Sequence, residues 1–237
     1  MSVVTVSSQY GAGARDVARL VADRLSLQYV DQAVLVDAAR YLGTTVQQVA
    51  EHDERTDSFR ERLVHFMQRS LERSAAAGID PVVGTANMEL MLAQTYSDLT
   101  EGVAPSFIDD RTYLQTVTGI IQELAQPGDM VIIGRGSQMI LRDRPNTTHI
   151  QLVADEAVRL QRVMQWESLN EDDAKNRIQE FNRSRSAFHK KFWKVDVWDP
   201  HLYDLVINTT TMSYAAAADL VAVAVQAQAG AVTPPRA

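Results

Sequence analysis

Two glycines and an arginine follow the first apolar run of the chain, and together they form a candidate anion-binding site. The run covers residues 3–6, the segment that we call the glycine loop covers residues 7–13, and Arg15 comes directly after it. Backbone N–H groups in such a loop, with the partial positive charge of the helix that follows, suit a phosphate group. Gly11 and Gly13 also accept backbone conformations that a Cβ atom opposes. We therefore predict that the loop binds phosphate.

The glycine loop departs from the most specific phosphate-binding pattern, G-x-x-x-x-G-K-[ST]. Ser8 stands in place of the first glycine, and Ala14 stands where the lysine belongs. Arg15 is then the nearest cation to do the work of the lysine. A guanidinium chelates two phosphate oxygens, with a geometry unlike that of an ammonium group. The alternative is a tight strand-to-helix turn that carries an incidental surface arginine.

A strongly basic stretch lies in the C-terminal third of the chain. Residues 175–194 hold seven cations and one acid. Phosphoryl transfer spreads negative charge over the transferred group, so cations that close over it lower the barrier, and a lid also excludes water. We take residues 175–198 as a basic lid, with Arg183 and Arg185 as catalytic cations because they lie near the expected end of a helix over residues 171–188. A solvated basic helix face is the alternative.

Arg135 lies just past an expected buried strand over residues 130–133, and Asp31 ends an expected short strand over residues 28–31. In an open parallel α/β sheet, ligands lie beyond the carboxyl ends of the strands. We therefore predict that both side chains contact a phosphorylated substrate. The alternatives are a turn arginine paired with a surface acid, and a carboxylate that only positions a helix.

The elements that position these residues alternate between strand and helix, which predicts an α/β fold with a parallel sheet covered by helices on both faces. The expected strands are, in chain order, residues 3–6, 28–31, 130–133, 149–153 and 205–207. We expect a single domain over residues 1–229, with a core of about 1–31 and 127–229 and a helical insertion of about 32–126. The tail, residues 230–237, is expected to be disordered.

The composition argues against several functions. The formal net charge of −7 disfavours general affinity for nucleic acid. The chain has no cysteine, which excludes a disulfide framework, a Cys-ligated zinc and a thiol nucleophile, and its five histidines show no H-x-x-x-H spacing. The sequence shows neither a signal peptide nor a window of about 18 uncharged apolar residues. We therefore expect a cytoplasmic protein that does not bind membranes.

Several segments, taken in order, resemble the cytidylate-kinase-like family, whose members are P-loop relatives of the bacterial cytidylate kinases. The segments are residues 4–18, 29–31, 132–136, 149–162, 198–200 and 203–209. The resemblance spreads over most of residues 3–225 and is vaguest over 32–126. It implies a P-loop NTPase-like fold and a nucleoside monophosphate kinase that moves the γ-phosphate of ATP, with Mg²⁺, to an acceptor such as CMP or dCMP.

The resemblance also implies roles for individual residues. ATP would lie on Ser8, Gln9, Tyr10, Gly11, Ala12, Gly13, Ala14 and Asp16, and Arg159 and Arg162 would reach its phosphates or base; the acceptor would meet Asp31, Arg135 and, from the insertion, Arg111. A plain surface pair is the alternative for Arg159 and Arg162. No residue is predicted to ligate a metal directly, since no acid ends the strand over residues 130–133, so Mg²⁺ would arrive with the nucleotide.

The chain departs from the family at two further positions. The lid pattern acid-x-x-Arg reads Asn182-x-x-Arg185, and Gly136 replaces the Asp that follows the Gly-Arg pair in related kinases. Two alternatives to an active kinase therefore stay open. One is a module of the same fold that binds small-molecule nucleotides without turning them over, and the other is a scaffold whose helical insertion forms a homodimer.

Overall fold

A computed structural model describes residues 1–30 and 110–229 of the chain. The chain divides into two compact units, Met1–Gln32 with Leu124–Ala237, and Ala33–Glu123. Helix α5 (Asp110–Ala125) confirms the helix that the sequence predicts at the end of the insertion. Asp31, the other helices expected in the insertion and the C-terminal tail lie outside the described residues.

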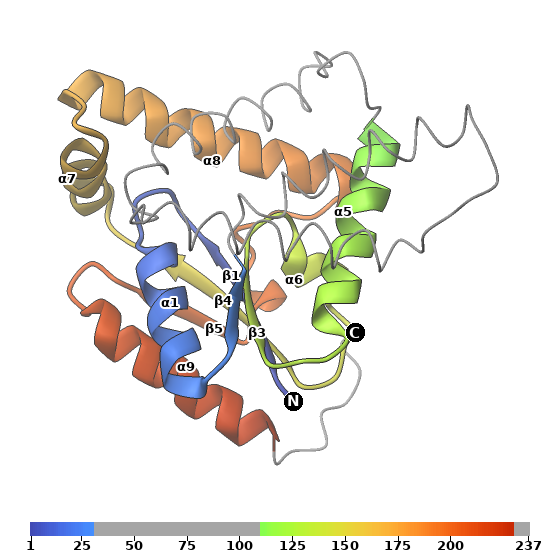
Figure 1. Ribbon diagram of the computed structural model, residues 1–237. Helices are drawn as coiled ribbons and strands as arrows, with labels where there is room; N and C mark the ends of the chain where they lie inside the picture. The colour runs from blue at the N-terminus through green and yellow to red at the C-terminus, as the bar shows by residue number, and fades with distance from the viewer. Residues whose placement is uncertain (31–109, 230–237) are drawn as a thin grey trace, which may run out of the picture. The chain divides into compact units, whose positions relative to one another are not determined.

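The first unit is built on a parallel sheet, as the sequence predicts (Figure 1). Its strands are β1 (Val3–Ser8), β2 (Gln28–Val30), β3 (Met130–Ile133), β4 (Thr147–Val153) and β5 (Leu205–Asn208). Within the described residues they are ordered β2-β3-β1-β4-β5, and each neighbouring pair is parallel. The five strands lie where the sequence predicts them, although β1 ends two residues later and β4 starts two residues earlier than expected.

One face of the sheet is apolar and forms the main core. Side chains alternate between the two faces of a strand, so Val4, Val6, Ile150 and Leu152 share this face, and each is at most 1% exposed. Helices α1 (Ala14–Leu25) and α9 (Tyr214–Ala229) contribute the buried residues that pack with them, and they lie side by side in Figure 1. Burial of each branched side chain stabilises the fold by roughly 1.5–3 kcal/mol.

The alternate positions of the same strands are polar and also buried. Thr5, Ser7, His149 and Gln151 are between 0% and 4% exposed, and the register places Thr5 beside His149 and Ser7 beside Gln151. The Thr5 hydroxyl and His149 Nδ1 are 2.6 Å apart and hydrogen-bonded. A buried polar layer is costly unless its groups find partners, and Thr5 and His149 find one in each other.

Three more helices follow β3 and β4: α6 (Ser137–Ile140), α7 (Glu156–Glu167) and α8 (Glu171–Trp193). The sequence predicts that the helix from residue 171 ends at residue 188, which is wrong, because the apolar side chains of α8 continue to Trp193. Phe188, Phe192 and Trp193 pack edge to face, and the helix ends only at Lys194, whose φ of 60° is left-handed. Arg183 and Arg185 therefore lie well inside α8.

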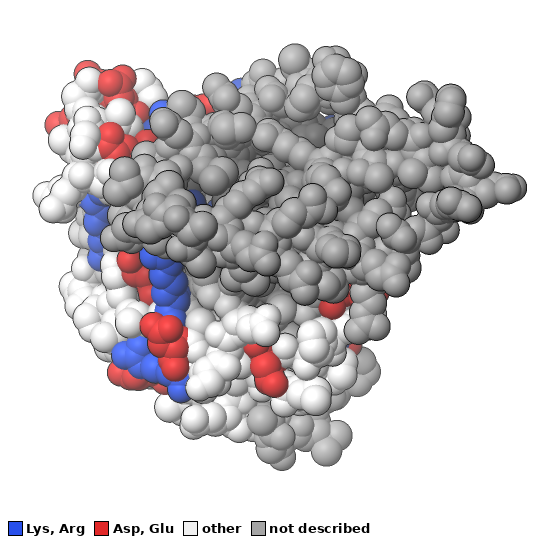
Figure 2. Space-filling model, viewed as in Figure 1, with Lys and Arg blue, Asp and Glu red and all other residues white. Residues whose placement is uncertain are grey.

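Two side-chain hydrogen bonds anchor the segment between α8 and β5. Trp198 donates its indole N–H to Ser186 Oγ at 2.9 Å, and the Tyr203 hydroxyl donates to the Val197 carbonyl at 2.8 Å. No helix of the described residues is both long enough and apolar enough to span a bilayer. On the face shown in Figure 2, basic and acidic side chains of the described residues lie beside each other, as Arg24 Nε and Asp219 Oδ1 do at 2.6 Å.

Candidate active site

The glycine loop turns the chain from the end of β1 into α1 through two left-handed residues. Gly11 has a φ of 83° and Gly13 a φ of 86°, and Gly13 caps α1 without a side chain. The first bond inside the helix runs from the Val17 N–H to the Gly13 carbonyl, at 3.1 Å. An α-helix leaves the N–H groups of its first turn without acceptors inside the helix, and they carry partial positive charge. This end of α1 therefore presents donors to an anion.

Three carbonyl groups of the loop, those of residues 10–12, accept hydrogen bonds from side chains that follow β4 and β5. Arg159 donates to the carbonyl of Tyr10 at 3.4 Å, Arg162 to that of Gly11 at 3.4 Å, and Thr209 Oγ1 to that of Ala12 at 2.9 Å. The N–H and C=O groups of one peptide plane point in opposite directions. The N–H groups of Gly11 and Gly13 therefore face away from these donors, on the side where a phosphate would lie.

Both loop glycines are also required by close neighbours. A Cβ atom on Gly13 would lie 2.3 Å from Cε1 of Tyr214, and one on Gly11 would lie 2.9 Å from the Arg159 carbonyl oxygen. The guanidinium carbon of Arg162 lies 5.1 Å from the centre of the Tyr214 ring. The loop is thus packed tightly on its outer side.

Arg159 and Arg162 lie at the loop and contact its backbone. Besides the loop, Arg159 donates from Nε to the Ala154 carbonyl at 2.9 Å, and Arg162 donates to the Thr209 carbonyl at 2.7 Å. Arg159 is only 7% exposed, so the alternative of a plain surface pair is wrong for this residue. Burial lowers the pKa of Arg159, although the charge of Glu156 opposes that shift.

Gln9 and Ser8 extend the sheet at the start of the loop. The Gln9 N–H donates to the Leu152 carbonyl at 2.9 Å, and its side-chain Oε1 accepts the Ala154 N–H at 3.0 Å. Ser8 is the last residue of β1 and is 7% exposed. These contacts fix the direction in which the loop leaves the sheet.

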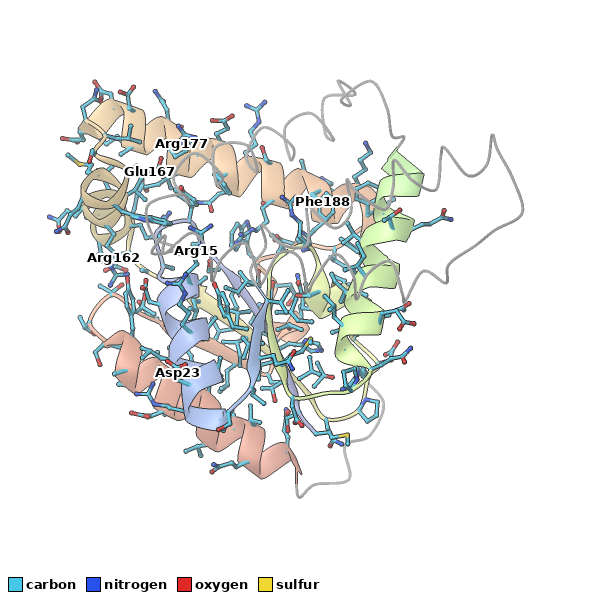
Figure 3. The ribbon with its side chains drawn as sticks, in the orientation of Figure 1. Arg15, Asp23, Arg162, Glu167, Arg177 and Phe188 are labelled. Carbon is cyan, nitrogen blue, oxygen red and sulfur yellow. The ribbon has the colours of Figure 1, made fainter. Side chains whose placement is uncertain are left out.

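Arg15 and Asp16 begin the first turn of α1 beside the loop. The guanidinium carbon of Arg15 lies 5.5 Å from the centre of the Trp166 ring on α7, and Figure 3 shows Arg15 and Arg162 at the same end of α1. Asp16 is exposed. The described residues hold no cluster of three or more His, Asp or Glu side chains that could bind a metal ion.

Three predicted substrate-binding or catalytic arginines differ in burial. Arg135 follows β3 with a left-handed φ of 54° and is fully buried, Arg185 is 7% exposed, and Arg183 is exposed. Nη1 of Arg185 has no hydrogen-bond partner in the described part of the chain. A buried guanidinium gains most from an anionic partner. Arg111 begins α5, but its side chain lies outside the described residues.

Neutral polar groups surround Arg185. His189 Nδ1 lies 2.9 Å from the Arg185 carbonyl and therefore carries the proton, so Nε2 accepts from the Gln138 amide at 2.8 Å. Burial lowers the pKa of His189 to about 4, and the charge of Arg185 adds to the shift while the bond to the Arg185 carbonyl opposes it. His189 is thus neutral at pH 7, and Arg185 is the cation of this group.

Sequence reasoning missed three residues that build the site: Asn182, Thr209 and Tyr214. Asn182 Oδ1 accepts the Tyr10 N–H at 3.2 Å, while Thr209, just after β5, and Tyr214, at the start of α9, contact the loop. The sequence held one signal for Thr209, since it ends the segment 203–209 that resembles the family. Tyr214 and Asn182 carry no local signal for contacts so distant along the chain.

The chain is similar to known cytidylate kinases over parts of its length. Residues 3–211 match the model of the Cytidylate kinase-like family. The cytidylate kinase of Methanopyrus kandleri is 32% identical over 100 residues, which cover 39% of this chain and 52% of that enzyme. The cytidylate kinase of Methanococcus maripaludis is 25% identical over 150 residues, which cover 55% and 84%. The match thus spans about half of the first enzyme and most of the second.

A solved structure shares the fold. The crystal structure of an uncharacterized protein from Eubacterium ventriosum has a TM-score of 0.59 and 15% sequence identity, and the match covers 95% of this chain and 99% of that one. At this identity the likeness concerns the fold alone. Since the family model extends from the first strand to beyond β5, and the glycine loop and sheet have the predicted geometry, the chain belongs to the cytidylate kinase-like family.

Proposed function

We propose that the protein is a nucleoside-monophosphate-kinase-like phosphotransferase, which moves the γ-phosphate of ATP to a nucleoside monophosphate, with CMP or dCMP as the first candidates. The observation that carries the proposal is the glycine loop at the start of α1. Arg159, Arg162 and Thr209 donate to the carbonyl groups of residues 10–12, so the N–H groups of Gly11 and Gly13 face the other way. Membership of a family named after cytidylate kinase supports this choice of reaction.

The chemistry needs cations more than it needs a base. A phosphate oxygen of the acceptor attacks the γ-phosphorus in line, and the bond from that phosphorus to the β–γ bridging oxygen breaks, which leaves ADP. The attacking oxygen is already ionised, so no side chain must remove a proton. Mg²⁺ bound to ATP neutralises charge on the β- and γ-phosphates. In our proposal, the loop holds the donor, Arg15 replaces the lysine, and the buried Arg135 and Arg185 neutralise the acceptor and the transferred group.

In this mechanism Arg15 takes the role of the loop lysine, although it lies one position later in the sequence. Its guanidinium lies against the Trp166 ring, beside the loop. An arginine side chain is long and its stem is flexible, so the head reaches a triphosphate on the loop by rotation of side-chain torsions alone. Arg183 is exposed and would contact the nucleotide only from a different rotamer or helix position.

A coupled assay tests the proposal. The protein is incubated with ATP, Mg²⁺ and each of a panel of nucleoside monophosphates, and ADP is measured. We expect ADP formation that requires an acceptor, falls at least about tenfold in Arg15→Ala, and persists in Arg19→Ala. Arg19 is a matched control because it lies one turn further along α1, against the Tyr29 ring. A wild-type protein that forms no ADP with any acceptor contradicts catalysis.

A second function, nucleotide binding without turnover, is favoured by specific replacements. The loop lacks the lysine, Gly134 instead of an acid follows β3, and Asn182 holds the loop where the family has a lid acid. Calorimetry separates the two functions. Tight binding of ATP with no acceptor-dependent ADP supports the binding module, and absence of ATP binding at millimolar concentration rejects both. Either function would place the protein where ATP and nucleoside monophosphates occur, and we propose the cytoplasm.

A further inference from the structure

The side chain of Tyr10 leaves the glycine loop and enters the space between α7 and α8. Its ring lies 4.2 Å from that of Phe181 and 6.2 Å from that of Trp166, centre to centre, with angles of 22° and 27° between the planes. Tyr10 is only 6% exposed. Such stacked rings bury a large apolar area and resist rotation. Tyr10 therefore joins the loop to the two helices that follow β4.

Polar contacts fix both ends of Tyr10. At the ring end, the hydroxyl donates to Glu167 on α7, whose other carboxylate oxygen lies 3.7 Å from Nε of Arg177 on α8 (Figure 3). At the backbone end, the Tyr10 N–H donates to Asn182 Oδ1 on α8, at 3.2 Å, and its carbonyl accepts from Arg159. The residue is thus held through its ring, its N–H and its carbonyl group.

The Asn182 contact lies one helical turn before Arg185. Three residues of an α-helix span roughly 4.5 Å along its axis and return to nearly the same face. The bond between Asn182 and Tyr10 therefore joins α8 to the loop at a point close to Arg185.

We infer that Asn182 and Tyr10 are positioning residues: the hydrogen bond between them holds the phosphate-binding loop against α8 and thereby sets the place of Arg185 relative to a phosphate on the loop. This inference rests on the proposed function for the ligand, but the bond itself does not. Asn182 occupies the position at which related kinases carry the lid acid. In this chain the side chain is used to hold the loop.

Hydrogen exchange of the Tyr10 amide tests the bond without any ligand. In Asn182→Leu, which keeps the size of the side chain but lacks an acceptor, we expect exchange to be about fivefold faster, the change that corresponds to one ordinary hydrogen bond. Asn182→Asp keeps an acceptor oxygen and should exchange as slowly as the wild type. Asn176→Leu, at an exposed position of the same helix, is the control. Equal exchange in Asn182→Leu and the wild type, or equal acceleration in both leucine variants, overturns the inference.

Binding of inorganic tripolyphosphate tests the link to Arg185. We expect Asn182→Leu and Arg185→Ala each to weaken binding, by about fivefold or more. If Asn182 acts by positioning Arg185, the double variant should bind no more weakly than Arg185→Ala alone. Losses that multiply in the double variant overturn the link. If the wild type binds no tripolyphosphate, the proposed function fails, and the exchange experiment still decides whether Asn182 holds the loop.

Discussion

Replacing Gly13 by alanine should damage the glycine loop in two separable ways. An alanine at a φ of 86° incurs the left-handed penalty of roughly 1–2 kcal/mol. Its Cβ would also lie 2.3 Å from Cε1 of Tyr214, so the ring must move, at a cost of roughly 1–3 kcal/mol. We therefore expect Gly13→Ala to lower the free energy of unfolding by roughly 2–5 kcal/mol, and to weaken tripolyphosphate binding at least about tenfold because the loop N–H groups are displaced.

Two further variants separate these contributions in urea unfolding. In a Tyr214→Ala background the steric contribution disappears, and Gly13→Ala should cost only roughly 1–2 kcal/mol. Gly128→Ala is the control, because Gly128 also has a left-handed φ, 74°, but precedes β3 at the opposite end of the strands, and its nearest neighbour is the exposed Met1. It should lose about 1–2 kcal/mol of stability and keep normal tripolyphosphate binding.

The reasoning is refuted by either of two results. The first is a Gly13→Ala variant that unfolds like Gly128→Ala, with no relief from Tyr214→Ala, since the Tyr214 contact would then carry no energy. The second is normal tripolyphosphate affinity in a folded Gly13→Ala protein. That result would show that the loop N–H groups do not bind the anion.

Three other predictions concern the side chains around the loop. The folded protein keeps His189 neutral down to about pH 4, whereas the unfolded chain protonates it near pH 6.5, so the free energy of unfolding decreases as the pH falls through this window. In urea titrations at pH 7 and pH 4, this decrease should be smaller in His189→Gln than in the wild type, by up to about 3 kcal/mol. Equal decreases in the two proteins would contradict burial of a neutral histidine. Arg162→Lys replaces the guanidinium, which donates to both the Thr209 and the Gly11 carbonyl, by a single ammonium group that cannot reach both. The free energy of unfolding should therefore fall by about 1–3 kcal/mol, and an unchanged urea midpoint would argue against this role. Arg185→Ala should lower the turnover number at least about tenfold while Arg183→Ala changes it less than about twofold, and equal effects in the kinase assay would show that burial does not distinguish the two.

The sheet and the loop could be predicted because their signals are local. Most of the strands are short runs rich in β-branched residues, and the loop is marked by two glycines between a strand and a helix. Such patterns depend on neighbours within a few residues. The family resemblance rests on the order of these segments over most of residues 3–225, and the family model matches residues 3–211.

The choice between Arg183 and Arg185 needed the helical phase, which the sequence also contains. Ile178, Phe181, Arg185 and Phe188 recur at spacings of three and four residues and form the buried face of α8. Arg183 falls outside that stripe. Treating the segment as a lid with a nearby end hid this pattern, although no glycine or proline within it indicates an end.

The contact between Tyr10 and Asn182 could not be predicted, since 172 residues separate the two and neither type is specific for such a bond. The same is true of the hydrogen bonds from Arg159 and Arg162 to the loop carbonyls, since these arginines are 149 and 151 residues from their acceptors. Side chains that support a backbone from behind leave no motif of their own. Only the three-dimensional fold, in which α7 lies against the loop, identifies these contacts.

The missing lysine should therefore affect transfer more than binding. Arg15 lies one residue after the lysine position, and successive residues of a helix differ by about 100° around its axis, so its side chain leaves α1 in another direction, toward Trp166. In the proposed function, backbone N–H groups of the loop and the start of α1 bind the donor, and Arg159 and Arg162 hold that backbone in place without help from Arg15. Arg15→Ala should then leave the dissociation constant for ATP within about threefold and lower the turnover number at least about tenfold. The opposite split, with binding lost and turnover kept, would mean that Arg15 acts on the bound donor in the ground state and that the loop alone cannot hold it.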